Sequence, residues 1–221
     1  MANERKETKK YTFTVEGETE KWYLEWLQAR INSQANTLYN VSIVAKVQQS
    51  PRKYAKTINP LSTPIITHIF DYESNSSEHI KKFKNVLTEI KEANSIKGKK
   101  FKYTPAYSNL TFELWMVLHK QSCNCHLTNR TQYLRHINRA YAESFESLEQ
   151  YKEETNFKRC LSKLSLENVF AAIHRAKIIM DIKTQNGEVP TQHDGFYYYT
   201  DNPALTIFES IEKILKECGL I

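Results

Sequence analysis

Three acidic residues stand directly after two short segments that have the composition of β-strands. Glu16 follows residues 11–15, and Asp71 and Glu73 follow residues 64–70. Both segments are rich in β-branched and aromatic residues, which favours strands. Because strand side chains alternate, Asp71 and Glu73 share one side. If the two strands are parallel neighbours, all three carboxylates meet at one edge of the sheet, where they could hold Mg²⁺ or move a proton.

These acidic patterns also have ordinary explanations. Acidic residues favour the start of a helix, which accounts well for Glu18 and Glu20 but less well for Glu16. An isolated Asp-x-Glu such as residues 71–73 is more often a solvated loop. The residues alone leave both interpretations open.

A fourth carboxylate lies inside an apolar segment. Glu113 is the only charged residue between Leu110 and Leu118. Burying it is costly unless a metal, a basic residue or free backbone N–H groups compensate. Ser108 or Asn109 is expected to cap the helix that carries it. The alternative is that Glu113 reaches solvent or a nearby lysine.

Cysteine and histidine residues follow this segment. Cys123, Cys125 and His126 suggest zinc, but the spacing is tight for a structural site and no second paired cluster follows, so a zinc site is not expected. His119 and His126 are expected at the surface or at helix ends.

Basic residues provide candidate contacts to phosphate. Arg52, Lys53 and Lys56 could line a groove for nucleic acid, and Arg175 and Lys177 lie on different faces of one predicted helix. A solvated helix face is the default interpretation for the last two. No Ser-His-Asp set, P-loop or dinucleotide fingerprint is recognisable.

Alternating strands and helices must position these residues. Strands are predicted over residues 11–15, 39–47, 64–70 and 101–107, with helices from about residue 18 and over 78–93. This alternation favours an α/β fold with a mostly parallel sheet flanked by helices. Later helices are predicted over 108–120, 128–149 and 165–183, and from Asn202-Pro203 onward. We therefore predict an α/β core over residues 1–120 and a mainly helical region over 121–221.

Bulk composition limits the class of protein. The 221 residues carry a formal net charge of +6, which is compatible with a polyanionic partner and equally with a soluble surface. No run of about 18 apolar residues is present, and residues 1–10 are polar and lack an apolar signal core. The four cysteines do not form a dense disulfide framework. We expect a cytoplasmic protein that does not span a membrane.

Taken together, the motifs resemble a known family. Over most of its length the chain resembles the RloB-like family, which is associated with the AbiLii abortive-infection proteins and with prokaryotic antiviral loci. The shared order is Val15-Glu16-Gly17-Glu18-Thr19-Glu20-Lys21, Phe70-Asp71-x-Glu73, Ser108-Asn109-x-x-Phe112-Glu113-Leu114-Trp115 and Asn202-Pro203-x-x-Thr206. The first and third motifs are quite specific, and the other two are weak.

The resemblance implies a variant of the Toprim fold, which topoisomerases, primases and some nucleases share. Carried over to this sequence, Glu16 is a general acid/base or metal ligand, Asp71 and Glu73 are the metal-binding pair, and Glu113 completes the site. Two positions depart from the family pattern: Glu73 stands where Asp is commoner, and Leu110 stands where Pro is common. Neither change removes a carboxylate.

The function implied by this family is that of a Mg²⁺- or Mn²⁺-dependent nuclease in antiviral defence, acting on RNA, tRNA included, or on DNA. Toprim-like defence nucleases commonly depend on an ATPase, so a separate ATPase subunit is expected, and a homo-oligomer is expected on general grounds. The alternative is a non-catalytic subunit that binds nucleic acid or senses phage. A third possibility, topoisomerase-like strand passage, has no isolated tyrosine motif in its support.

Overall fold

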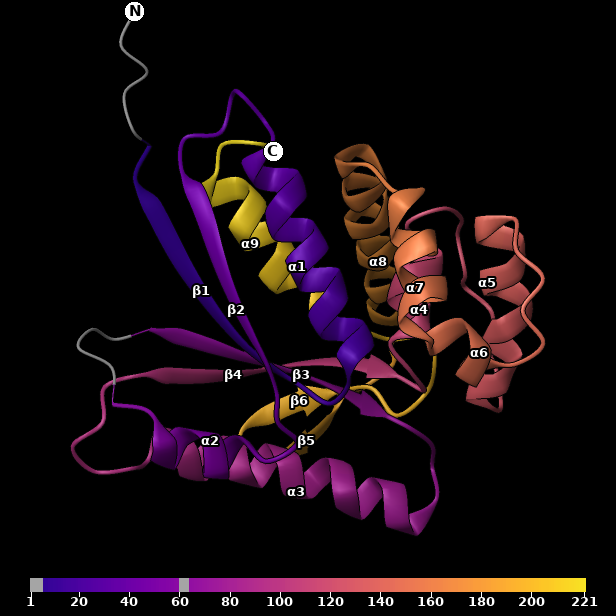
Figure 1. The fold of residues 1–221 in the computed structure, drawn as a ribbon. Coiled ribbons are helices and arrows are strands. Elements are labelled where there is room, and N and C mark those ends of the chain that lie inside the picture. Colours follow the sequence, from indigo (N-terminus) through magenta and orange to yellow (C-terminus); the bar gives the residue numbers. More distant parts are fainter. Residues whose placement is uncertain (1–5, 60–63) are drawn as a thin grey trace, which may run out of the picture.

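A parallel sheet lies at the centre of the molecule. The computed structural model describes residues 6–59 and 64–221, and within these ranges four strands pair in parallel in the order β2-β1-β3-β4 (Figure 1). The strands span Thr8–Val15 (β1), Asn40–Val47 (β2), Ile65–Tyr72 (β3) and Lys102–Asn109 (β4). The predicted α/β class with a parallel sheet is confirmed. Residues 1–5 of the polar N-terminal segment lie outside the described residues.

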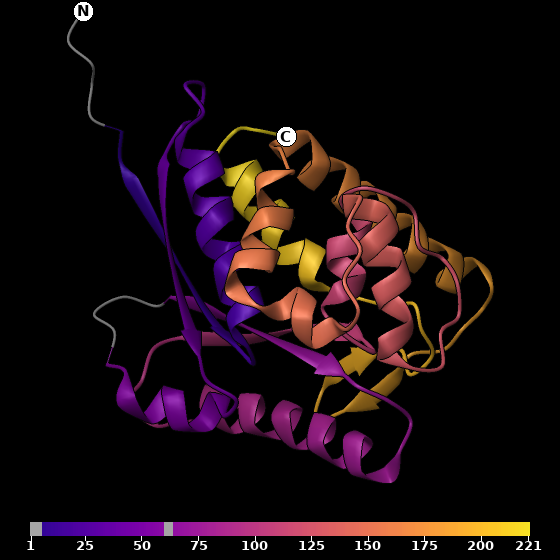
Figure 2. The same cartoon turned by 45° about the vertical axis from the view of Figure 1, so that its right-hand side comes forward.

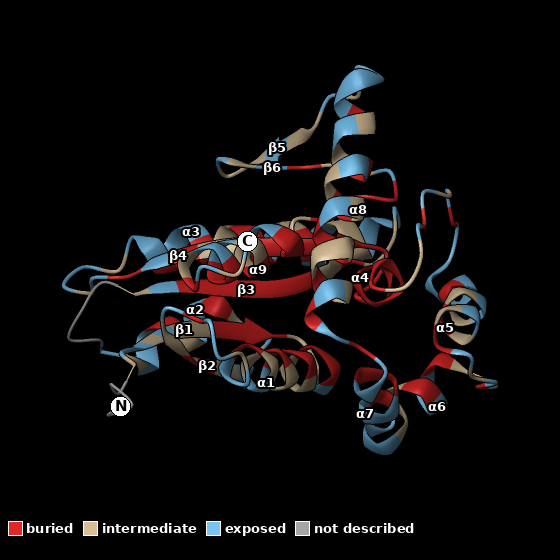
Figure 3. Cartoon of the chain, turned by 90° about the horizontal axis from the view of Figure 1, so that it is seen from above, coloured by how far each residue is buried: buried red, intermediate tan, exposed pale blue. Residues whose placement is uncertain are grey.

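Helices cover both faces of this sheet, as Figure 1 shows. One face carries α1 (Glu18–Asn32) and α9 (Ile207–Glu217), and the other carries α2 (Pro51–Thr57) and α3 (Ser77–Asn94). Strand alternation divides the apolar side chains between them: Ile69 of β3 packs with the cluster under α1, whereas Phe70 packs with the cluster over α3. The central strand β3 is therefore buried over most of its length (Figure 3).

The helical region lies beyond the carboxyl ends of the strands (Figures 1 and 2). It consists of α4 (Glu113–Leu118), a 3₁₀ turn η1 (Arg130–Gln132), α5 (Tyr133–Tyr141), α6 (Leu148–Lys152), α7 (Glu154–Ser162) and α8 (Leu166–Gln185). The helix predicted over 165–183 is confirmed. No helix in the described ranges is long and apolar enough to cross a membrane.

The single helix predicted over residues 128–149 is wrong. α5 ends at Tyr141, Ala142 adopts the left-handed conformation with φ of 50°, and α6 begins only at Leu148. The side chain of Asn138 explains the break, because it binds the backbone N–H and C=O of Phe145 at 3.0 and 2.8 Å. This pair of hydrogen bonds turns the chain back toward α5.

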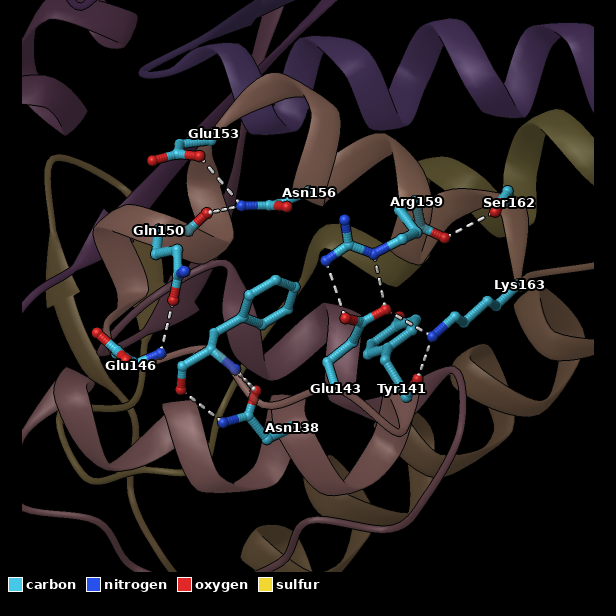
Figure 4. A network of polar contacts seen from close by, with 11 residues as sticks. Asn138, Tyr141, Glu143, Glu146, Gln150, Glu153, Asn156, Arg159, Ser162 and Lys163 are labelled. Atoms are coloured by element: carbon cyan, nitrogen blue, oxygen red, sulfur yellow. Dashed lines mark hydrogen bonds and ion pairs between the residues drawn. The ribbon is translucent and has the colours of Figure 1, made fainter.

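A polar network then fixes α5, α6 and α7 relative to one another (Figure 4). Glu143 accepts two hydrogen bonds from Arg159, at 3.0 and 2.9 Å, and one from Lys163 at 2.6 Å. The hydrogen bond from Arg159, followed by that from Lys163, lowers the pKa of Glu143 to about 2. Asn156 of α7 donates to the carbonyl of Gln150 of α6 at 2.7 Å. The network therefore holds α6, whose last residue is Lys152, in a defined place.

A hairpin that we did not predict precedes the last helix. It pairs β5 (Thr191–His193) with β6 (Phe196–Tyr198) in antiparallel fashion. The turn residues Asp194 and Gly195 have φ angles of 53° and 89°, so the Asp-Gly dipeptide was the sequence signal for this hairpin. Tyr198 anchors it, with its ring centre 4.8 Å from that of Phe83.

The last helix also begins later than predicted. Asn202-Pro203 belongs to an irregular segment, and α9 starts at Ile207. Thr206 ties this segment to β4, because its hydroxyl accepts from the N–H of Tyr107 at 3.0 Å and its own N–H donates to the carbonyl of Tyr107 at 2.9 Å. One apolar cluster contains residues on both sides of position 120, so the helical region packs directly on the sheet.

Candidate active site

The sheet order creates a switch point between β1 and β3. The chain leaves β1 for β2 on one side, whereas β3 leads to β4 on the other. Open α/β sheets bind ligands at the carboxyl ends of the strands at such a point. Glu16 and Asp71 lie there, and Glu16 Oε2 accepts a hydrogen bond from the N–H of Asp71 at 3.3 Å. Since β1 and β3 are parallel neighbours, the expected meeting of these residues at one edge is confirmed.

An open pocket of about 280 Å³ occupies this edge. Glu16, Asp71 and Glu73 all line it, so the structure brings the predicted metal-binding residues to one place. Sequence reasoning did not place five further charged residues of the lining here: Glu18, Glu20, Lys82, Arg130 and Lys152. The pocket is therefore acidic at its base and has basic residues at its rim.

Asp71 is the most constrained of the acidic residues. Its Oδ1 atom is shielded from solvent and has no hydrogen-bond partner among the described residues. Burial raises the pKa of Asp71 well above its ordinary value, and the charges of Glu20, Glu16 and Glu113 raise it further. A carboxylate in this position is stabilised by a cation, because a cation supplies both the missing partner and the countercharge.

Glu20 contributes from the first turn of α1. It is buried, and its Oε2 accepts a hydrogen bond from the Thr19 hydroxyl at 2.9 Å. Burial raises the pKa of Glu20, and the charge of Glu113 adds to the effect. Gly17 leaves room for this carboxylate, because a Cβ at that position would lie 3.0 Å from Oε2. The helix dipole was the only role expected for Glu20 from the sequence, whereas in the structure this residue lines the pocket.

Glu113 is fully buried and is paired with a lysine. Its Oε1 lies 3.1 Å from Lys152 Nζ, and its Oε2 accepts from the Thr111 hydroxyl. Burial acts to lower the pKa of Lys152, but the charges of Glu113 and then Asp71 outweigh it and raise that pKa. Of the partners expected for Glu113, the structure supplies a basic residue.

The helix that carries Glu113 has a different start from the one predicted. Its N-cap is Phe112, so the prediction of a cap from Ser108 or Asn109 is wrong. Both residues still belong to β4, and Asn109 donates instead to the carbonyls of Tyr199 and Thr200, at 3.0 and 2.9 Å.

Glu73 and Glu16 share one lysine at the rim. Lys82 Nζ lies 2.5 Å from Glu73 and 3.8 Å from Glu16, and Arg130 lies 3.7 Å from Glu73. Burial acts to raise the pKa of Glu73, but the hydrogen bond and charge of Lys82, with His79 and Arg130, hold it below its ordinary value. For Glu16 burial prevails over Lys82, and the pKa is raised. Glu73 is thus the ionised partner of cations, whereas Glu16 is suited to carry a proton.

The residues of the pocket fit a hydrated Mg²⁺ ion. In the described ranges, no three acidic residues bring their carboxylate oxygens within 4.8 Å of one another. A different group, Cys123, Cys125 and His136, does meet this distance and lies outside the pocket. Mg²⁺ commonly takes only one or two protein carboxylates and keeps several waters. Asp71, whose Oδ1 lacks a partner among the described residues, meets this need together with Glu16.

The predicted phosphate contacts do not lie at this pocket. Arg175 Nη1 donates to the carbonyl of Leu118 at 2.5 Å, and Lys177 pairs with Glu212 at 2.7 Å. The remaining three lie on α2, where Arg52 pairs with Glu92 at 3.0 Å and the other two are exposed: Lys53 and Lys56. That these five residues contact nucleic acid stays a prediction.

His119 and His126, both expected at the surface or at helix ends, differ in their burial. His119 ends α4 as expected, but it is fully buried, with Nδ1 2.9 Å from the carbonyl of Trp115 and Nε2 3.1 Å from the Tyr23 hydroxyl. Burial lowers the pKa of His119 to about 4, so it stays neutral and structural. His126 is exposed, as expected, and its Nδ1 lies 3.3 Å from the carbonyl of Asn202.

Comparison with known proteins agrees with this arrangement of motifs. A sequence profile described as RloB-like protein matches residues 11–214. The chain belongs to the RloB-like family. No curated protein and no solved structure matches it.

The motifs that carried the resemblance to this family have separate roles in the structure. The first two provide the acidic residues of the pocket, and the third provides Glu113, which pairs with the pocket residue Lys152. The fourth is structural, because the Asn202 side chain accepts from the N–H of Leu127 at 2.7 Å and donates to its carbonyl at 2.6 Å. It thus ties the connection between α4 and α5 to the segment before α9.

Proposed function

We propose that this chain is a Toprim-type nuclease that uses Mg²⁺ or Mn²⁺ and acts on RNA, tRNA included, or on DNA in prokaryotic antiviral defence. The main support is the convergence of Glu16, Glu20 and Asp71 at the switch point of the sheet. Burial raises the pKa of all three. Strongly perturbed acidic residues in a pocket are typical of a site that binds a cation or moves protons. Family membership is compatible with this proposal.

Each charged residue has a role in this proposal. Asp71 and Glu16 would hold the ion at the base of the pocket. When bound, Mg²⁺ would stabilise the charge that develops on the scissile phosphate and lower the pKa of a nearby water. Glu16, whose pKa is raised by burial, would accept the proton of the attacking water. Lys82 and Arg130 would exchange their contacts with Glu73 for the flanking phosphates.

A partner belongs to the same proposal. The chain has no P-loop of its own, and Toprim-like defence nucleases commonly depend on an ATPase. We therefore propose a separate ATPase subunit, by analogy with these proteins. Co-expression with an ATPase encoded beside the gene, followed by affinity purification of the complex, tests it; failure to co-purify counts against this partner.

The nuclease activity is tested by incubating the purified chain with Mg²⁺ or Mn²⁺ and either total tRNA or plasmid DNA. We expect cleavage that disappears on chelation and falls at least about 100-fold in Glu16→Ala. Glu25→Ala is the matched control, because Glu25 lies exposed on the same helix and does not line the pocket. The reaction is repeated with the neighbouring ATPase and ATP. Equal cleavage by Glu16→Ala and wild type would reject the site.

A non-catalytic subunit that binds nucleic acid or senses phage is the second candidate. It is favoured by the ion pairs that hold Glu73 and Glu113, since these acidic residues already have basic partners. This function predicts binding of RNA or DNA without cleavage under every condition above, even with the ATPase present.

A further inference from the structure

We propose that Cys123, Cys125 and His136 form a second metal site, separate from the acidic pocket, that binds a thiophilic divalent ion of the Zn²⁺ type. In the sequence, Cys123, Cys125 and His126 suggested zinc, but the tight spacing and the lack of a second paired cluster argued against a zinc site. The third residue in the structure is His136 of α5, which lies 13 positions after Cys123.

The geometry of the three side chains suits such an ion. The sulfurs of Cys123 and Cys125 lie 3.7 Å apart, and two thiolates of a tetrahedral zinc site are about 3.8 Å apart, given Zn–S bonds of about 2.3 Å. The nearest nitrogens of His136 lie 3.9 Å from each sulfur. One ligand atom from each residue falls within 4.8 Å of the other two. A small turn of the imidazole would bring one nitrogen to the bonding distance.

The surroundings favour an ion with one open coordination position. Cys123 is buried, whereas Cys125 and His136 are half-buried, so the site is reachable from solvent. The described residues supply three ligands, which leaves the fourth position to water or to a small ligand.

An ion here would affect the shape of the acidic pocket. It would join the connection after α4 to α5 and so close the segment 123–136, which contains Arg130. Arg130 lines the acidic pocket and lies 3.7 Å from Glu73. Within the same segment, Leu127 is already fixed by Asn202. The site would therefore fix Arg130 through the backbone, as a structural clip.

Titration of the full chain with Co²⁺ tests the site without any nucleic acid. The protein is purified under reducing conditions, stripped with a chelator and titrated with Co²⁺. We expect one ion per chain with a thiolate-to-cobalt charge-transfer band, and we expect Zn²⁺ to displace it. His136→Asn, Cys123→Ser and Cys125→Ser should lose the band or bind at least about tenfold more weakly. His126→Asn and Cys160→Ser are the matched controls and should bind as wild type does.

Further measurements separate this site from the acidic pocket and from a disulfide. The band should persist in Asp71→Asn and in excess Mg²⁺, so it reports on the cysteine site even if the nuclease proposal fails. Circular dichroism checks that each variant folds; His136→Asn is the most informative because His136 is only half-buried. A folded wild-type chain that shows no band, equal Co²⁺ binding by wild type and His136→Asn, or a Cys123–Cys125 disulfide in the reduced preparation would each overturn the proposal.

Discussion

Asp71→Asn is expected to reduce metal-dependent cleavage at least about 100-fold and, at the same time, to stabilise the metal-free protein. Asparagine keeps the shape of the side chain but removes its charge. Burial raises the pKa of Asp71 well above its ordinary value, and the charges of Glu20, Glu16 and Glu113 add to the shift. The same charge that would hold the ion therefore destabilises the fold when no ion is present.

The stability difference between Asp71→Asn and wild type should depend on pH. Because the folded-state pKa of Asp71 lies above the unfolded value, its stabilising contribution is fully present below the unfolded pKa and is lost as the pH rises through the folded pKa. Asp71→Asn should therefore melt a few degrees above wild type near pH 8, and the gap should shrink toward pH 4. Mg²⁺ should raise the melting temperature of wild type more than that of the variant.

Thermal melts at several pH values, with and without Mg²⁺, check this prediction. Asp194→Asn is the control, since Asp194 pairs with Lys91 at 2.8 Å on the hairpin and does not line the pocket. Asp194→Asn should not melt above wild type at high pH, and Mg²⁺ should raise its melting temperature as much as it raises that of wild type. An Asp71→Asn chain that is less stable than wild type at pH 8 in the absence of metal would contradict our account of the pocket.

Lys152→Met is expected to be the most destabilising surface-accessible change in the helical region. It leaves Glu113, which is fully buried, without its partner at 3.1 Å. Breaking a buried pair on one side costs about 3–5 kcal/mol, and the cost here is smaller because 36% of the Lys152 side chain is exposed. Because the pKa of Lys152 is raised in the folded protein, its stabilising contribution is present at neutral pH and is lost as the pH rises through that pKa.

Urea denaturation of single and double variants measures this effect. Lys158→Met is the control: its pair with Glu154 is exposed, and its loss should change the free energy of unfolding by less than about 0.5 kcal/mol. The double variant Glu113→Gln with Lys152→Met should recover most of the lost stability. If Lys152→Met and Lys158→Met behave alike, Lys152 does not balance the buried charge of Glu113.

Local signals in the sequence determined the α/β framework and the first part of the site. β-Branched runs marked the strands, and the serines of residues 74–77 marked the start of α3, where Ser76 accepts from the N–H of His79 at 3.2 Å. Glu16 and Asp71 could be placed because a residue after a parallel strand always lies at the same edge of the sheet. These features depend on residues that are close in sequence, so periodicity and spacing suffice to find them.

Tertiary structure alone decided which charges and ligands meet. Lys152 reaches Glu113 across 39 positions because the turn at Asn138 and the contacts of Glu143 set the direction of α6. His136, and not the adjacent His126, meets the cysteines because α5 packs against the connection after α4. Such contacts depend on how helices pack, and helix packing leaves no fixed spacing in the sequence. The sequence therefore determined where the acidic residues stand, whereas the fold determined which cations and ligands stand beside them.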